Sequence, residues 1–103
     1  MTSPREAKNY LSVCRSEKFF VLKTGEKLKN LHQLSFKLEE IEEEVFLHHS
    51  SKEGCDFSNW VWDVVGDKKL AVELYIRRGD KEAFQEKLNE RLIELEEAIR
   101  DLS

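Results

Sequence analysis

Residues 46–71 constrain the fold more than any other stretch, because they hold an apolar stripe with a marked start and stop. The stripe follows the i, i+3, i+4, i+7, i+8 spacing of one buried helix face and comprises Phe57, Trp60, Val61, Val64 and Val65. Asp56 is placed to be its N-cap. Gly66 can adopt the left-handed conformation that ends a helix, and Asp67 can cap a second helix directly after it. We therefore expect two short helices that meet at a sharp corner, with the stripe as the hub of the core.

Trp62 lies off this stripe. It either packs against another element of the chain or forms part of an exposed patch that contacts a partner. The spacing leaves both alternatives open.

The same stretch resembles an uncharacterised family of small prokaryotic domains. The shared pattern is F-x-x-H, six residues, then D-F-x-x-W-hydrophobic-x-D-V-x-G-D-x-x-L-A, and it is matched by Phe46, His49, Asp56, Phe57, Trp60, Val61, Asp63, Val64, Gly66, Asp67, Leu70 and Ala71. The resemblance covers residues 19–75, and it implies a short strand and a glycine turn that lead into a helix. Cys55 and Ser50 depart from the pattern, where Asn and Val are expected. The family has no established activity, so the resemblance implies a fold and not a function.

Capping residues predict further helices before this stretch. Ser3, Pro4 and Glu6 match a capping box with proline at the first helical position. We expect about three helical turns there, with an apolar face of Ala7, Tyr10, Leu11 and Cys14. Residues 19–29 indicate a small β-hairpin around a glycine turn.

Asn30 can cap the helix that follows the hairpin. Its apolar residues step by 3 and 4 along one seam, which comprises Leu31, Leu34, Leu38, Ile41, Val45 and His48. We expect one continuous helix that ends at His48 and His49, with His48 packed in the core. Acidic residues at 39–44 fall on the opposite face, which is either solvated or a docking surface for a basic partner.

The last two helices are also delimited by their caps. A helix with Leu70, Ala71, Leu74 and Tyr75 on one face should stop at Arg77-Arg78-Gly79, and Asp80 can cap the final helix. The final helix, of about 22 residues and 33 Å, has a stripe of Phe84, Leu88, Leu92, Leu95, Ile99 and Leu102. That length exceeds what a small core covers. The stripe either folds back on the same chain or forms a homodimer through Leu88, Leu92, Leu95 and Ile99.

The length predicts a single domain, residues 1–103, and the helical spacing of the apolar residues predicts the mainly α class. We expect four to five helices and a small β-hairpin near residues 19–29, with an N-terminal helix in 1–18, the family-like core in 19–79 and the long helix in 80–103. No run approaches the 18 or so apolar residues of a membrane span, and residues 1–10 lack a signal-peptide core, so we expect a cytoplasmic protein without membrane contact. Cys14 and Cys55 are isolated thiols, which fits a reducing compartment.

The charge is distributed unevenly along the chain. Residues 1–38 hold eight Lys/Arg and three Asp/Glu, a balance of +5, and residues 39–103 hold nine and eighteen, a balance of −9; together they give the net −4. A basic N-terminal part could contact phosphates. Its lysines are spaced apart, however, and no nucleic-acid motif accompanies them.

His49 and Asp56 are the polar pair for which the sequence suggests a role. We expect a hydrogen bond between them that clasps the long helix to the Trp60 helix. Two alternatives use the same residues: a metal site with His48 or His49, Cys55 and Asp56, and a hydrolytic arrangement of Cys55, His49 and Asp56. The first matches no established zinc spacing, and the second lacks a glycine-rich oxyanion loop.

These observations predict a small protein–protein interaction module that self-associates through helical surfaces, with Trp62 as a contact residue. The alternative is a weak nucleic-acid binder that uses the basic N-terminal part. The sequence shows no nucleotide loop, catalytic triad spacing or cofactor fingerprint, so we expect no enzymatic activity, cofactor or metal.

Overall fold

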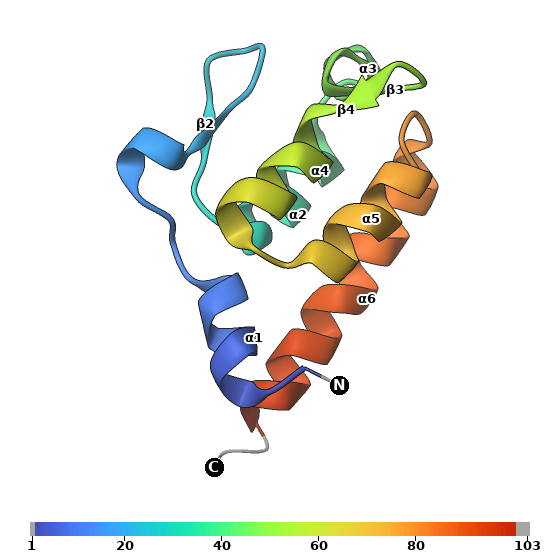
Figure 1. The fold of residues 1–103 in the computed structure, drawn as a ribbon. Coiled ribbons are helices and arrows are strands. Elements are labelled where there is room, and N and C mark those ends of the chain that lie inside the picture. The colour runs from blue at the N-terminus through green and yellow to red at the C-terminus, as the bar shows by residue number, and fades with distance from the viewer. Residues whose placement is uncertain (1, 101–103) are drawn as a thin grey trace.

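The computed structural model describes residues 2–100, which form a mainly α fold with two small antiparallel hairpins (Figure 1). The helices are α1 (Pro4–Leu11), α2 (Leu31–Glu40), α3 (Glu43–His49), α4 (Asp56–Trp60), α5 (Lys68–Ile76) and α6 (Lys81–Arg100). Two shorter helical turns are η1 (Ser16–Lys18), of the 3₁₀ type, and η2 (Val61–Val65), of the π type. Strand β1 (Phe20–Val21) pairs with β2 (Lys27–Leu28), and β3 (Ser50–Ser51) pairs with β4 (Gly54–Cys55). The expected mainly α class and the hairpin within residues 19–29 are confirmed, but the described residues form six helices instead of the expected four to five, and a second hairpin, β3–β4, that was not expected.

Helix α6 runs along one side of the molecule and is contacted by α1, α2 and α5 (Figure 1). Its 20 residues span about 30 Å. Helix α4 lies in front of α2 in the view of Figure 1 and continues into η2, after which the chain turns toward α5. No helix in residues 2–100 has the length and apolar character needed to cross a membrane.

The core is centred on α4, as the apolar stripe predicts. Phe57 is fully buried, and its ring lies 4.9 Å from Phe20 and 5.7 Å from Phe84, centroid to centroid. Trp60 is also buried, and its indole N–H donates to the Lys18 carbonyl oxygen at 2.8 Å. Aromatic side chains from β1, α4 and α6 therefore meet at one place in the core.

Most of the expected helix ends are confirmed. Ser3 and Glu6 form the capping box, and Asn30, Asp67 and Asp80 each accept from a backbone N–H of the helix that follows. Helix α1 is shorter than expected, because the chain leaves the helix at Leu11. Cys14 thus lies outside the helix, and its backbone N–H donates to the Lys29 carbonyl oxygen at 3.0 Å.

The expected N-cap of α4 was wrong. Cys55 is the cap, and its sulfur accepts from the Ser58 N–H at 3.4 Å. Asp56 is the first residue of the helix, and its carboxylate points to His49 instead.

The continuous helix expected over residues 31–49 is two helices, α2 and α3, with an extended break at Ile41 and Glu42. The break is stabilised by Lys81, whose Nζ donates to the freed Ile41 carbonyl oxygen at 3.0 Å. It also changes the register of the seam. Phe46 and His49 are therefore buried, whereas His48, expected in the core, is exposed.

The stripe of α4 does not continue into η2 with a 3.6-residue period. The Gly66 N–H donates to the Val61 carbonyl oxygen at 2.8 Å, an i→i+5 bond that widens the last turn. Val61 is fully buried, but Val64 and Val65 are only partly buried because the wider turn moves them off the stripe. Gly66 then ends the turn with φ +89°, as expected.

The stripe of α6 folds back on its own chain. Phe84, Leu88 and Leu95 are fully buried and Leu92 is 8% exposed, so Leu88, Leu92 and Leu95 are not available as dimer contacts on the folded chain. The reason is that three helices together cover α6, which no single neighbour could do. Ile99 is half-buried at the edge of the core, and Leu102 lies outside the described residues.

Candidate functional site

Helix α5 is apolar on two opposite sides. Leu70, Ala71 and Leu74 face the core and are buried. Val72 and Ile76 lie on the opposite side and are 49% and 64% exposed. Tyr75, expected on the inward face, is 43% exposed and belongs to the outward side. We call the outward residues, together with Trp62 and Arg78, the α5 outer face; it comprises Trp62, Lys68, Lys69, Val72, Tyr75, Ile76 and Arg78.

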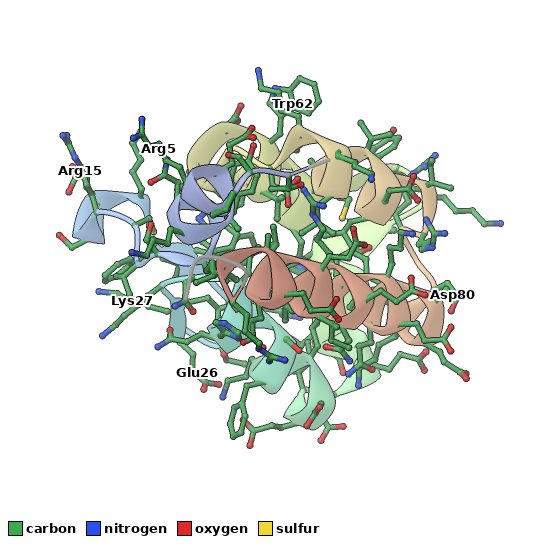
Figure 2. The ribbon with its side chains drawn as sticks, turned by 90° about the horizontal axis from the view of Figure 1, so that it is seen from below. Arg5, Arg15, Glu26, Lys27, Trp62 and Asp80 are labelled. Atoms are coloured by element: carbon green, nitrogen blue, oxygen red, sulfur yellow. The ribbon has the colours of Figure 1, made fainter. Side chains whose placement is uncertain are left out.

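Trp62 extends this face beyond the start of α5. Its side chain is 44% exposed and projects away from the body of the molecule (Figure 2). The Lys68 ammonium lies 4.9 Å from the ring centroid, a cation–π distance that joins Trp62 to the first turn of α5. Of the two alternatives that the sequence left open for Trp62, the structure shows the exposed one.

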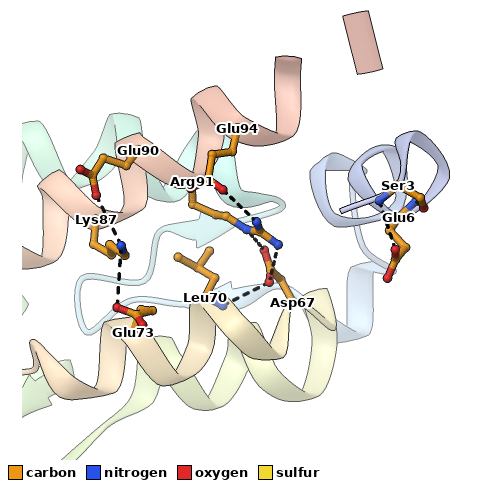
Figure 3. Close-up of polar contacts among 9 residues, drawn as sticks. All are labelled: Ser3, Glu6, Asp67, Leu70, Glu73, Lys87, Glu90, Arg91 and Glu94. Atoms are coloured by element: carbon orange, nitrogen blue, oxygen red, sulfur yellow. Dashed lines mark hydrogen bonds and ion pairs between the residues drawn. The ribbon is translucent and has the colours of Figure 1, made fainter. Parts of the chain in front are cut away.

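The charged side chains on the α5 outer face are positive. Lys68 and Lys69 occupy its first turn. At the other end, the Arg78 guanidinium lies 4.0 Å from the centroid of the Tyr75 ring and donates to the Lys52 carbonyl oxygen. Glu73, at the edge, forms an ion pair with Arg77 at 2.9 Å and a second one with Lys87 at 3.8 Å. Figure 3 shows the pair with Lys87.

A buried ion pair fixes the start of α5 to α6. Arg91 donates to both carboxylate oxygens of Asp67, at 2.7 and 3.1 Å (Figure 3). The same Asp67 accepts from the Leu70 N–H at 3.1 Å, so a single carboxylate caps α5 and holds Arg91. Burial lowers the pKa of the Arg91 guanidinium, but the hydrogen bonds and charge of Asp67 outweigh it and raise the pKa above its usual value. The guanidinium therefore stays charged inside the fold.

Sequence reasoning missed Arg91. It identified Asp67 as a cap only. The sequence does contain an indication of its burial. Arg91 lies three residues after Leu88 and four before Leu95, which places it on the inward side of α6.

A cleft of about 680 Å³ opens beside this ion pair, between α1, α5 and α6. Tyr10, Lys69, Glu94 and Glu97 are among its lining residues, so its charge is mixed. Burial, and then the charge of Glu6, raises the pKa of the Tyr10 hydroxyl. Within residues 2–100, every buried side-chain N or O atom has a hydrogen-bond partner, so none is left pointing into the cleft for a ligand.

His49 and Asp56 are in contact, as expected for a clasp. His49 Nδ1 lies 3.0 Å from the Asp56 carboxylate, and Nε2 accepts from the Lys23 backbone N–H at 2.9 Å. The second bond assigns the imidazole proton to Nδ1, because Nε2 must present a lone pair. The ring also packs against Phe20 and Phe57, at 5.1 and 5.4 Å between centroids. His49 thus connects α3 to α4 and also to the β1–β2 turn, a contact that the sequence did not indicate.

Cys55 does not complete the hydrolytic arrangement. Its sulfur contacts Ser50 Oγ and the Ser58 N–H, while both ring nitrogens of His49 are engaged elsewhere. A thiolate nucleophile requires an adjacent base, which this geometry does not provide. The part of the chain that the structure describes also brings together no group of three or more His, Cys, Asp or Glu that could hold a metal ion.

We expect replacement of His49 by alanine to lower the free energy of unfolding by about 2–4 kcal/mol, because it empties a packed site and leaves the Lys23 N–H without its acceptor. His49→Gln retains an acceptor near the position of Nε2 and should lose less. The exposed neighbour gives a matched control, since His48→Ala should change stability by less than about 0.5 kcal/mol. Urea unfolding measures all three. Equal losses for His48→Ala and His49→Ala would contradict this assignment.

No family model, curated protein or solved structure matches this chain. The resemblance to a family of small prokaryotic domains therefore stays a prediction.

Proposed function

We propose that this chain is a small protein–protein interaction module and that the α5 outer face contacts the partner. The observation that carries the proposal is the exposure of a second apolar side of α5, opposite the one that packs on the core. Scattered apolar residues on a surface are normal, but contiguous apolar patches with a polar rim mark interaction sites. Tyr and Trp are also the residue types that contribute most to such contacts.

The surroundings of the face support this role. Arg91 and Asp67 hold the start of α5 firmly against α6. A helix fixed in this way presents its side chains without a large ordering cost on binding. The adjoining π turn supports it further, because such turns occur frequently at functional sites.

Symmetric self-association through this face has less support. Lys68, Lys69 and Arg78 would face the same residues of a second copy, and like charges across an interface are unfavourable. Asp63 is the one exposed carboxylate in residues 61–76, all of which the structure describes.

Nucleic-acid binding through the N-terminal half also has less support. Lys37 is bound by Glu26 and Glu40, and Lys23 lies 3.6 Å from Glu44. The basic half thus partly neutralises acids of its own chain, which leaves fewer free cations for phosphates.

Affinity capture from a lysate of the source organism tests the proposal with two matched variants. Ile76 is 64% exposed on the α5 outer face, and Phe36 is 66% exposed on α2. Glutamine is a good helix former, so Ile76→Gln and Phe36→Gln each remove one exposed apolar side chain while leaving its helix intact. We expect a partner that wild type and Phe36→Gln retain and that Ile76→Gln and Trp62→Ala lose. If wild type and the three variants all capture the same proteins, the proposal is refuted.

A further inference from the structure

We infer that the partner segment is an acidic amphipathic helix that lies along α5 between Trp62 and Arg78. The inference rests on the proposed function and names the chemistry of the occupant. It is drawn from the shape of the α5 outer face, the charges at its two ends and the cations that lie over its aromatic rings.

The shape of the face fits one helix. Its residues follow a single stripe of α5, with Lys68, Val72 and Ile76 four residues apart and Tyr75 beside them. The nine residues of α5 span about 14 Å. A standard interface between folded proteins buries about 800 Å² per partner, over 20 to 30 residues. The stripe on α5 is smaller than such an interface. It matches a partner segment of two to three helical turns with apolar residues at i, i+3, i+4 and i+7.

The charge of the face selects an acidic segment. Lys68 and Lys69 lie at one end and Arg78 at the other, on a chain whose net charge is −4. Lys68 is the first residue of α5 and Arg78 lies two residues beyond its last, Ile76, so the two cations flank a helix of about 14 Å. Carboxylates just outside both ends of the partner's apolar stripe would meet these cations.

Each aromatic ring of the face already has a cation on one side, which favours a peptide over a nucleic acid. Lys68 lies over one face of Trp62 and Arg78 over one face of Tyr75, so a base could stack on those faces only by displacing the cation. The two side chains between them, Val72 and Ile76, are aliphatic and offer no stacking surface. Partner carboxylates that attract Lys68 would also uncover the Trp62 ring for apolar contact, whereas Arg78 is held over Tyr75 by the carbonyl oxygens of Lys52 and Tyr75.

Two synthetic peptides of identical helical design test the inference. Both have leucines at i, i+3, i+4 and i+7; one has glutamates flanking this stripe, and the other has lysines in the same places. With fluorescein-labelled peptides and anisotropy on the full chain, we expect the glutamate peptide to bind at least about tenfold more tightly. That preference should shrink between about 0.05 and 0.5 M NaCl, because screening weakens exposed charge contacts.

Variants of the full chain locate the contact. Ile76→Gln should weaken binding of the glutamate peptide at least about fivefold, and Phe36→Gln should leave it unchanged. Replacing both cations, Lys68→Glu with Arg78→Glu, should reverse the preference in favour of the lysine peptide. A reversal of this kind cannot come from general loss of folding, because one peptide gains affinity.

Several outcomes would overturn the inference. Equal binding of the two peptides, or no reversal in the doubly substituted chain, excludes an acidic helix as the occupant. Tighter binding of a single-stranded oligonucleotide or of phosphatidylserine vesicles than of the glutamate peptide, lost in Ile76→Gln, assigns the face to one of those ligands. A concentration-dependent mass in sedimentation that Ile76→Gln abolishes assigns it to a second copy of the chain. If capture depends on Ile76 and Trp62 while neither peptide binds, the interaction module stands and only the acidic helix is rejected.

Discussion

Arg91→Leu is expected to lower the free energy of unfolding by about 3–5 kcal/mol. The substitution leaves the carboxylate of Asp67, which is 1% exposed, buried without its cation. An uncompensated buried charge is among the most destabilising changes known for single substitutions. For a domain with roughly 5–15 kcal/mol of total stability, a loss of this size is a large fraction of the whole. Urea unfolding followed by circular dichroism gives the value directly.

A double variant separates the lost charge pair from the lost packing. Asn in place of Asp67 still accepts from the Leu70 N–H, so Asp67→Asn retains the cap of α5 and removes the charge. We therefore expect Arg91→Leu combined with Asp67→Asn to be more stable than Arg91→Leu alone. If the two single losses simply add in the double variant, the ion pair is not the source of the effect.

Phe57→Ala is expected to destabilise the fold by a similar amount, about 3–5 kcal/mol. Phe57 is fully buried, and its ring contacts aromatic rings from β1, α3 and α6. Truncation opens a cavity among rigid rings that belong to three elements, which cannot all move inward together.

Phe36→Ala provides the control for this prediction. The same side chain is removed from a site that is 66% exposed, so the change should stay within about 0.5 kcal/mol. Comparable losses at Phe36 and Phe57 would show that α4 is not the hub of the core.

The two predictions bear on function through α5. Its inward side depends on the core around Phe57, and its start depends on Arg91 and Asp67. Either variant should therefore also weaken any contact made by the α5 outer face. Ile76→Gln differs from both, because we expect it to change binding without changing stability.

The candidate site could be only partly predicted from the sequence. Trp62 stood out because it lies off the stripe of α4. The exposed side of α5 was missed, although Val72 and Ile76 are four residues apart and lie off the stripe of Leu70, Ala71 and Leu74. The sequence pattern shows two apolar sides, but it does not say which of them the core covers. The sequence also did not say whether the apolar stripe of α6 is covered by its own chain or exposed to a second copy. In the structure α1, α2 and α5 cover it.

The sequence by itself determined the helix caps at Ser3, Asn30, Asp67 and Asp80, the stop at Gly66 and the apolar face of α4. These features depend on hydrogen bonds and side-chain contacts within about four residues along the chain. Only the tertiary structure decided the break at Ile41, the burial of Arg91 against Asp67 and the exposure of the α5 outer face. Each of these depends on groups far apart in the sequence, such as Lys81 at the break and Arg91 at the start of α5. Local residues fix where a helix begins and ends, but the neighbours that fold against it fix which of its faces meets water.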